Sequence, residues 1–427
     1  MTTLIELHDH NIRISSPQGL LGESPGFANT FETPPVFGAD ALGLTRLHPQ
    51  QSFNQFWFQL GLDPLVSKNK LFRHQADLAF SHLESITKQF ALDGDTVFAV
   101  PSHYSANQLA TLLGLVKHCS INAAGLVDLA LLALANLHEH QQALFMDVQL
   151  HQTVLTLVTK EQGELIRQKV LPIPSTGLLS LHDAWANTIT DAFIKQSRFD
   201  PLHNADTEQY IYSELGGWLK TIAASKEILL EINNKGSIHQ ASLTLNNFEQ
   251  RAQNIFNKVS QEIDSISSSI TPIFALERIS SLPGLPQAIP NIIPVSNNAI
   301  TQNGYQHLTL IKGSGESLKL VSRLPIDEKN IALSKTSSAS SASRPSHFVF
   351  EHKAYALSDM KSGINLPELK LSAPIKISLQ DQDYCLLANS EIDLEFNGST
   401  LTETALLKIG DCITVNKHFT IEFIQVR

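Results

Sequence analysis

One short stretch of this chain has the residue types and spacing of a phosphate-binding turn, apart from its glycines. Residues 143–158 predict a strand, a tight turn and a second strand, and Asp147 stands just before the turn. A turn that holds phosphate needs glycine, because its backbone N–H groups must come within hydrogen-bonding distance of the anion, often at positive φ. Gln149, Leu150 and His151 occupy these positions instead. We expect their side chains to block an anion, so that the acidic residue remains without the phosphate chemistry.

Two histidine-containing triplets suggest metal binding, since imidazole and carboxylate groups are usable ligands. On a strand, His8 and His10 would share one face, with Asp9 between them; a second triplet spans residues 138–140. Polar residues at a strand end and at a helix end are the interpretation that we favour, and we expect no metal site. Residues 313–317 resemble a phosphate loop but lack its Lys-Ser/Thr ending, and no Gly-x-Ser-x-Gly nucleophile motif occurs.

Composition excludes several functional classes. The 427 residues carry a formal net charge of −10, so the chain lacks the basic field that nucleic acid or an anionic membrane would attract. The three cysteines show no metal-ligand spacing and are too few for a disulfide framework, which favours a reducing compartment. No apolar run reaches the roughly 18–20 residues of a membrane span, and no signal peptide is evident. We therefore expect a cytoplasmic protein without a membrane span.

The elements that would position these residues alternate along the first part of the chain. Up to about Ile311, short β-type runs alternate with helical patterns, for example residues 96–100 before a helix at 107–117. This alternation predicts an α/β fold. A serine-rich linker follows at residues 334–345, and only short strands come after it, which predicts a small β-sandwich. Residues 313–333 could extend the first domain or begin the second.

Apolar spacing predicts the long helices and part of the core. Helices are expected at residues 183–197, 206–232 and 246–266, the last with an apolar stripe that reads as core. The aromatic cluster at residues 53–58 is interpreted first as a core helix and second as a surface for a partner protein.

Five segments in this order resemble one known family. They resemble the nucleotide-binding domain of DnaK-type heat-shock chaperones, which belong to the actin-like ATPase superfamily, and the resemblance covers about residues 1–312. The segments are 37–41, 97–108, 190–200, 243–256 and 295–304. The resemblance implies a two-lobed actin-like ATPase fold at residues 1–312, an ambiguous segment and linker at 313–345, and the β-sandwich at 346–427.

Under this resemblance, three residues match the cofactor-binding positions of the family. Glu6 and Asp147 match the carboxylates of the two phosphate turns, and Lys226 matches one member of the basic pair that sandwiches adenine. The first turn has His8 in place of its glycine. The family's catalytic glutamate matches Leu129.

Further departures affect the other nucleotide contacts. The glycine pair that approaches phosphate falls near Ser180, and the adenosine loop falls in residues 274–279. The catalytic lysine has no clear counterpart, since Lys68 and Lys70 lie in a shortened segment of uncertain register. Losing one donor from such a site commonly costs two or more orders of magnitude in rate. We therefore expect no catalytic residues and no cofactor.

The end of the chain resembles another family over about 80 residues. Residues 396–423 resemble the end of a forkhead-associated domain, with an Asn-Gly turn at 397–398 and Gly410-Asp411 before a strand. The phosphothreonine-reading pattern of that family is not found, so a docking or packing module is favoured over a phosphopeptide reader. Together the features predict a catalytically degenerate DnaK-like protein that acts as a scaffold or regulator for a protein partner. The alternative is a divergent chaperone-type ATPase that binds ATP or ADP with Mg²⁺ through Glu6, Asp147 and Lys226.

Overall fold

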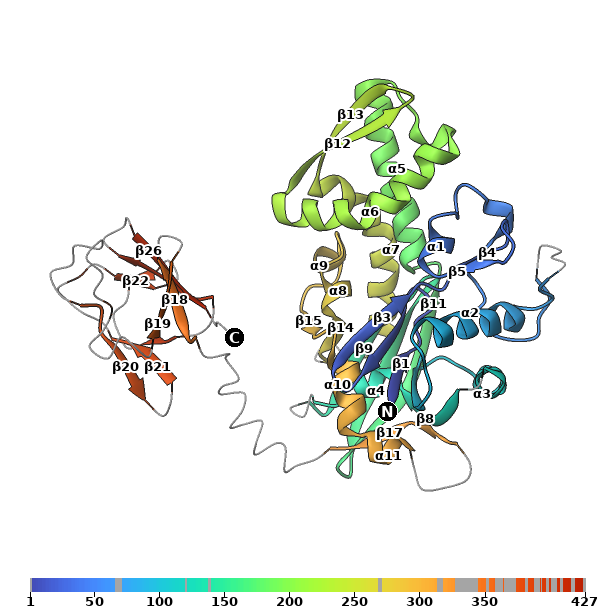
Figure 1. The fold of residues 1–427 in the computed structure, drawn as a ribbon, viewed down its shortest axis with the longest axis horizontal. Helices are drawn as coiled ribbons and strands as arrows, with labels where there is room; N and C mark the ends of the chain where they lie inside the picture. Colours follow the sequence, from blue (N-terminus) through green and yellow to red (C-terminus); the bar gives the residue numbers. More distant parts are fainter. Residues whose placement is uncertain are drawn as a thin grey trace. The chain divides into compact units, whose positions relative to one another are not determined.

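The chain forms two compact units, Met1–Ile326 and Asp327–Arg427. The computed structural model describes most of the first unit and a smaller share of the second (Figure 1). The described residues are 2–65, 71–119, 121–136, 140–267, 271–312, 318–326, 345–350, 353–357, 364, 374–380, 383–387, 392, 394–396, 399–400, 405–407, 410–415 and 419–424.

The first unit contains two six-stranded sheets whose central strands repeat one topology. The first sheet has the order β16-β8-β7-β1-β2-β3, in which β1, β2 and β3 form an antiparallel meander and β7 and β8 run parallel to β1. Its strands are β1 (Thr3–Glu6), β2 (Ile12–Ser16), β3 (Gly19–Ser24), β7 (Asp95–Val100), β8 (Asn122–Asp128) and β16 (Leu320–Val321).

The second sheet has the order β15-β14-β9-β10-β11-β17. Here β9, β10 and β11 form the meander, and β14 and β15 are the parallel strands. Its strands are β9 (Gln142–Val148), β10 (Gln152–Glu161), β11 (Glu164–Pro174), β14 (Ile273–Leu276), β15 (Ile292–Val295) and β17 (Arg323–Pro325). The strand–turn–strand prediction for residues 143–158 is confirmed.

The ambiguous stretch after residue 312 completes both sheets as far as it is described. Strand β16 pairs with β8 of the first sheet, and β17 pairs with β11 of the second. Residues 318–326 therefore belong to the first unit.

One short apolar helix lies between the two sheets. Helix α4 (Leu129–Leu134) is buried along its whole length and contacts β7 and β8 as well as β9, β10 and β11. Because no face of this helix is exposed to water, its sequence is a continuous apolar run and not an apolar stripe on one face. The helices of the C-terminal part of the unit are α8 (Glu277–Ser280), α9 (Leu285–Ala288), α10 (Ala299–Gln306) and α11 (Leu308–Lys312).

The longer helices follow the predicted apolar spacing, with one correction. Helices α2 (Gln75–Gln89), α3 (Ala106–His118), α5 (Leu178–Ser197) and α7 (Leu245–Ile266) are present, and Phe248, Ala252 and Phe256 are buried on the α7 stripe. The helix predicted at 206–232 is too long. Helix α6 (Ala205–Ser225) ends there because Lys226 takes a left-handed φ of 66° at the C-cap.

The residues after α6 form a hairpin of β12 (Glu227–Asn234) and β13 (Ser237–Thr244). In Figure 1 this hairpin lies at one end of the first unit and β17 lies at the other. The alternation of buried and exposed residues along β12 is the period of a half-buried strand, which the helical interpretation overlooked.

The aromatic cluster at residues 53–58 is not helical, which corrects the prediction of a core helix. Phe53 ends β6 (Ser52–Phe53), which joins β4 (Ala28–Asn29) and β5 (Val36–Phe37) beside α1 (Ala39–Leu42) and the 3₁₀ turn η1 (Pro49–Gln51). Phe56 and Trp57 are nevertheless fully buried. The Trp57 indole N–H donates to Nδ1 of His82 at 3.0 Å, so these rings are held in the core from a turn.

The second unit contains two sheets around one core cluster. The strands of the larger sheet are β18 (His347–Phe350), β19 (Lys353–Ala356), β22 (Leu394–Phe396), β23 (Ser399–Thr400), β25 (Cys412–Val415) and β26 (Phe419–Ile424); those of the smaller are β20 (Ile377–Gln380), β21 (Asp383–Leu386) and β24 (Ala405–Leu406). Phe348 of the larger sheet and Leu386 of the smaller belong to the same buried cluster. The predicted α/β class is confirmed, and no described helix is both long and apolar enough to cross a membrane.

Candidate functional site

The two turns that follow β1 and β9 meet through a buried carboxylate. Oδ1 of Asp9, in the β1–β2 turn, accepts the backbone N–H of Leu150, in the β9–β10 turn, at 2.7 Å. Burial raises the pKa of Asp9 to about 6, against the lowering effect of the N–H groups of Leu150 and His151. The Asp9 carboxylate thus lies where the glycine turns of a phosphate site would present their amides to an anion.

The neighbouring backbone donors are also occupied. Gln149 donates its N–H to the carbonyl of Gln152 at 2.9 Å, which closes the hairpin turn. Leu178 and Leu179, at the N-terminus of α5, donate to the carbonyls of Gln149 and Leu150 at 2.8 and 2.9 Å. A helix N-terminus normally offers free N–H groups to an anion. Here the first turn of α5 uses two of them to hold the β9–β10 turn.

Two glycines are required at this site, but both approach the turns from other segments of the chain. A Cβ on Gly26 would lie 2.0 Å from the carbonyl oxygen of Asp9, and a Cβ on Gly177 would lie 2.4 Å from the carbonyl oxygen of Leu150. The close backbone approach that only glycine permits is therefore used to pack the chain against its own turns.

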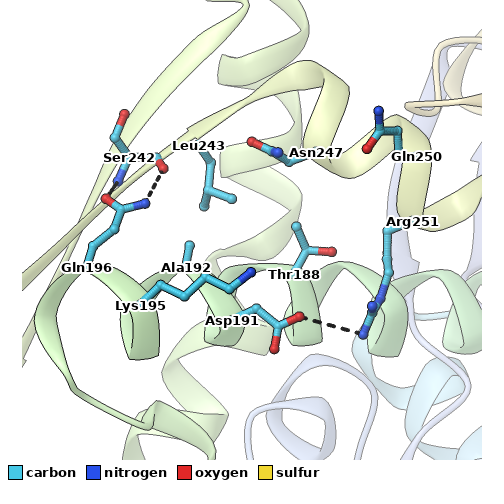
Figure 2. Close-up of a pocket in the computed structure, with 10 residues that line it drawn as sticks. All are labelled: Thr188, Asp191, Ala192, Lys195, Gln196, Ser242, Leu243, Asn247, Gln250 and Arg251. Atoms are coloured by element: carbon cyan, nitrogen blue, oxygen red, sulfur yellow. Dashed lines mark hydrogen bonds and ion pairs between the residues drawn. The ribbon is translucent and has the colours of Figure 1, made fainter.

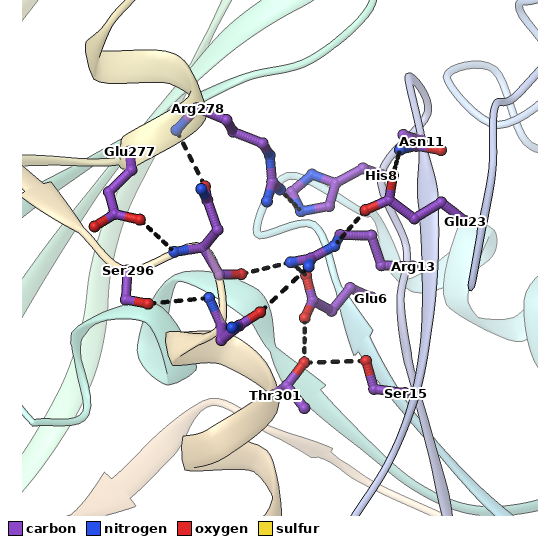
Figure 3. Close-up of polar contacts among 12 residues, drawn as sticks. Glu6, His8, Asn11, Arg13, Ser15, Glu23, Glu277, Arg278, Ser296 and Thr301 are labelled. Carbon is purple, nitrogen blue, oxygen red and sulfur yellow. Dashed lines mark hydrogen bonds and ion pairs between the residues drawn. The ribbon is translucent and has the colours of Figure 1, made fainter. Parts of the chain in front are cut away.

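Glu6 belongs to a network that Arg13 centres (Figure 3). Glu6 is fully buried at the end of β1, accepts the Thr301 hydroxyl at 2.7 Å and lies 3.4 Å from the Arg13 guanidinium. Arg13, on β2, also donates to the carbonyl of Asn297 at 2.5 Å and to the Glu23 carboxylate at 2.9 Å. Burial raises the pKa of Glu6, and Arg13 and Thr301 oppose that rise. The predicted ligand Glu6 thus ties the first sheet to α10, and Arg13 ties it to the segment before that helix.

Asp147 lies in a second chain of contacts with His8 and Arg278. Nδ1 of His8 is 3.5 Å from Asp147, and Nε2 of His8 is 3.3 Å from the Arg278 guanidinium. Burial lowers the pKa of His8 far below its usual value, so the ring is neutral. Because a guanidinium can only donate, Nε2 must be the acceptor and Nδ1 carries the hydrogen that faces Asp147. Burial raises the pKa of Asp147 to about 6, while the Gln149 amide, which donates at 2.9 Å, opposes this.

A third contact joins the sheets beside the position that matches the family's catalytic glutamate. Leu129 is buried at the start of α4, and the preceding Asp128 accepts the Ser102 hydroxyl and the Arg167 guanidinium, both at 2.8 Å. Arg167 comes from β11 of the second sheet and also donates to the Ser102 carbonyl at 3.0 Å. Asp128 caps α4 through the N–H of Ala130 at 3.0 Å, so this carboxylate has a structural role.

The charged groups at the site act on one another electrostatically. Asp9, Asp128 and Arg278 affect the pKa of Asp147, and Glu6 and Arg13 affect that of Arg278. The linked groups are the carboxylates Glu6, Asp9, Asp128 and Asp147 and the guanidiniums Arg13, Arg167 and Arg278. Each cation already contacts a carboxylate, a histidine or a carbonyl, and the acids outnumber the cations. A polyphosphate placed here would therefore add charge of the sign that is already in excess.

The third predicted ligand lies in a different environment. Lys226 is exposed at the C-cap of α6, and its ammonium group donates to the carbonyl of Ala223 at 3.0 Å. Among the described residues it has no contact with Glu6 or Asp147. Lys68 and Lys70 lie outside the described residues.

The predicted metal motifs give no cluster in the described part of the chain. The rings of His8 and His10 lie 5.2 Å apart, and no described group of three or more His, Cys, Asp or Glu side chains is placed to hold a metal ion. Two members of the second triplet, His138 and Glu139, and the loop at 313–317 fall outside the described residues.

A groove elsewhere on the first unit is polar and exposed (Figure 2). It has a volume of about 390 Å³ and lies between α5, β13 and α7. Asp191 and Arg251 pair across it at 4.0 Å, and both side chains are about half exposed. The Gln196 amide bridges the backbone N–H and carbonyl of Ser242 at 2.8 Å each. Such solvated pairs are worth little energetically, so this groove is a weaker site than the joined turns.

Sequence reasoning missed Arg13 and Arg278, and it interpreted Asp9 as a polar residue at a strand end rather than as a contact between the two turns. Neither arginine stands in a motif: Arg13 lies opposite Glu6 in the β1–β2 hairpin, and Arg278 contacts His8 from a segment remote in the sequence. Gly26 and Gly177 were also missed. A Cβ at either would clash with the backbone of a turn, but a glycine in the sequence does not say which turn it approaches.

No protein-family model matches this chain, and no curated protein is significantly similar to it. The resemblance to DnaK-type chaperones therefore depends on the residue pattern and stays a prediction.

Proposed function

We propose that this protein is a catalytically inactive, DnaK-like member of the actin-like ATPase superfamily that acts as a scaffold or regulator for a protein partner. The repeated strand order of the two sheets supports this, because each sheet has a three-stranded antiparallel meander followed by two parallel strands. One fold can serve many functions, so the function depends on the residues of the site.

The contact between Asp9 and Leu150 carries the proposal. A nucleotide would have to displace a buried carboxylate from the Leu150 N–H and pull Gln149 and Leu150 away from the first turn of α5. The displaced Asp9 would remain near the incoming phosphates and repel them. A turn whose backbone donors at Gln149, Leu150, Leu178 and Leu179 are occupied by the chain itself gains little from a triphosphate.

A fold of this kind that does not hydrolyse nucleotide can still bind other proteins through its exposed surface. The outer face of the β12–β13 hairpin exposes Leu229 and Ile238, at 60% and 66% of their full accessibility. The second unit adds further surface. A protein partner is therefore the expected ligand class, and the second unit is a docking or packing module under the same proposal.

Nucleotide titration tests the proposal against the alternative, in which Glu6, Asp147 and Lys226 hold Mg-ATP or Mg-ADP. A ligand at a hundred times its dissociation constant adds about 2.7 kcal/mol of stability, which shifts a melting curve visibly. We expect no shift with either nucleotide at millimolar concentration and no heat in calorimetry. A saturable shift, or hydrolysis that Asp147→Ala removes, would establish the alternative instead.

A further inference from the structure

A cavity of about 350 Å³ lies beside the joined turns. His10 of the β1–β2 turn and Leu150 of the β9–β10 turn line it. Phe27 and Leu42 add apolar wall from the N-terminal segment, and Leu179 adds it from α5. Volumes of about 300–1,000 Å³ with mainly apolar walls and few polar groups are typical of small-molecule sites.

The charged groups at the cavity are already paired with one another. Arg46 contacts the Asp183 carboxylate at 2.9 Å and the Glu208 carboxylate at 3.3 Å, and its guanidinium lies 3.7 Å from the centre of the Tyr212 ring. The Tyr212 hydroxyl donates to Asp183 at 2.5 Å. An anionic ligand would meet two carboxylates and one occupied cation. A cationic ligand would have to compete with Arg46 for both the carboxylates and the ring face.

Two uncharged imidazoles supply the polar part of the lining. Burial lowers the pKa of His10 to about 3 and that of His182 to about 4, so both rings are neutral at physiological pH. Neither ring nitrogen of His10 has a hydrogen-bond partner in the described part of the chain. Nδ1 is shielded from solvent, whereas the side chain as a whole is only half-buried and lines the cavity, so Nε2 is the nitrogen that a ligand can reach. A ligand in the cavity can donate to Nε2 or accept from it.

We propose that this cavity binds a small, uncharged aromatic molecule that carries one hydrogen-bonding group, such as a hydroxyl, directed at Nε2 of His10. The apolar walls and the Phe27 and imidazole rings favour a flat apolar body, and the charged groups, which are already paired with one another, disfavour an ion. Such a ligand would touch both turns, through His10 and Leu150, and would stabilise the arrangement in which Asp9 joins them. The inference stands whether or not the protein binds nucleotide, because the cavity lies beside the joined turns.

A matched series of one-ring compounds tests the proposal on the full chain. The probes are phenol, toluene, benzoate and benzylammonium, followed by shifts of ¹³C-labelled leucine methyl groups, since Leu42, Leu150 and Leu179 line the cavity. We expect phenol to shift these methyls saturably and to bind more tightly than the other three. Tighter binding of benzoate, or no response of these methyls to phenol, would overturn the proposal.

Variants locate the binding and keep the test independent of folding. His10→Phe keeps a ring but removes its nitrogens, so phenol should lose about two- to tenfold in affinity, the worth of one hydrogen bond, while toluene should not. Leu179→Trp should fill the cavity and abolish both. His48→Phe is the matched control, because His48 stacks on Phe31 at 3.5 Å and does not line the cavity. Unchanged phenol binding in His10→Phe would refute the assigned site even if Leu179→Trp failed to fold.

Discussion

Asp9→Asn should stabilise the protein at neutral pH and not at acid pH. The amide keeps an oxygen for the Leu150 N–H but has no charge to bury. In the native protein, burial raises the pKa of Asp9 from 3.8 to about 6. The carboxyl group therefore contributes its full stability below pH 3.8, where it is protonated, and this contribution is lost as the pH rises through 6. At about 1.4 kcal/mol for each pKa unit the full difference is about 3 kcal/mol. About 2 kcal/mol of it falls between pH 4.5 and 7.5.

Urea unfolding of Asp9→Asn and the natural protein in parallel from pH 4.5 to 7.5 measures this difference. The free energy of unfolding of the variant should gain about 2 kcal/mol on that of the natural protein across the range. Asp95→Asn is the control, because the Lys312 ammonium at 2.6 Å holds the pKa of Asp95 below its usual value of 3.8, so its difference from the natural protein should be flat across this range. A difference for Asp9→Asn that is independent of pH, like that of Asp95→Asn, would refute a desolvated Asp9 carboxylate.

Three other contacts of the first unit give predictions of known sign. Arg167→Met should lower the free energy of unfolding by about 3–5 kcal/mol in urea titrations, because the buried Asp128 carboxylate loses its cation. Burial lowers the pKa of His82 to about 3, so ¹⁵N spectra should show a neutral ring down to about pH 4.5. Because the unfolded chain protonates this ring below pH 6.5 and the folded protein does not, the free energy of unfolding should fall by about 2–3 kcal/mol between pH 6.5 and pH 4.5. Gly177→Ala should cost about 2 kcal/mol or more in the same titrations, because its Cβ would clash with backbone atoms.

The chain offers controls for the arginine and the glycine variants. Arg323→Met removes an exposed partner of Glu164 at 3.9 Å and should change stability by less than about 1 kcal/mol. Adding Asp128→Asn to Arg167→Met should recover most of the loss. Gly114→Ala should stabilise helix α3 by about 0.5–1 kcal/mol, since its Cβ meets no atom within 4 Å. Equal losses within the arginine pair or the glycine pair, or a ring at His82 that protonates near pH 6.5, would contradict the assignments.

The sequence predicted correctly those helices and strands whose apolar residues recur at the spacing of the element they form. The hairpin at 143–158 and the stripe of α7 follow directly from alternation and from helical spacing. The errors occurred where the signal is ambiguous over a few residues. Residues 227–232 continue the apolar spacing of α6, and only the left-handed backbone of Lys226 separates the helix from the strand. Phe56 and Trp57 are buried from a turn, so an aromatic cluster without helical periodicity was taken for a helix.

The site was predictable in its acids but not in their partners. Glu6 and Asp147 lie at the ends of β1 and β9, as a phosphate site would require. Arg13 lies opposite Glu6 in the β1–β2 hairpin, so this pair depends on the register of the hairpin, which the strand pattern alone did not give. Arg278 lies in a helix of four residues and contacts His8, which is remote in the sequence, so its place depends on tertiary packing that one sequence does not specify.

The structure also changes the reason for expecting no phosphate at these turns. Steric bulk was the sequence argument, but the three turn side chains are directed to other uses. Gln149 donates to Asp147, Leu150 lines the apolar cavity, and His151 contacts the carbonyl of Asn54 at 3.0 Å. Under the proposed function, the turn is closed to an anion because the amides of Gln149, Leu150, Leu178 and Leu179 are bonded to the chain itself. Glycine at the three turn positions would therefore remove side chains without freeing these N–H groups, and Asp9 would still accept the N–H of residue 150.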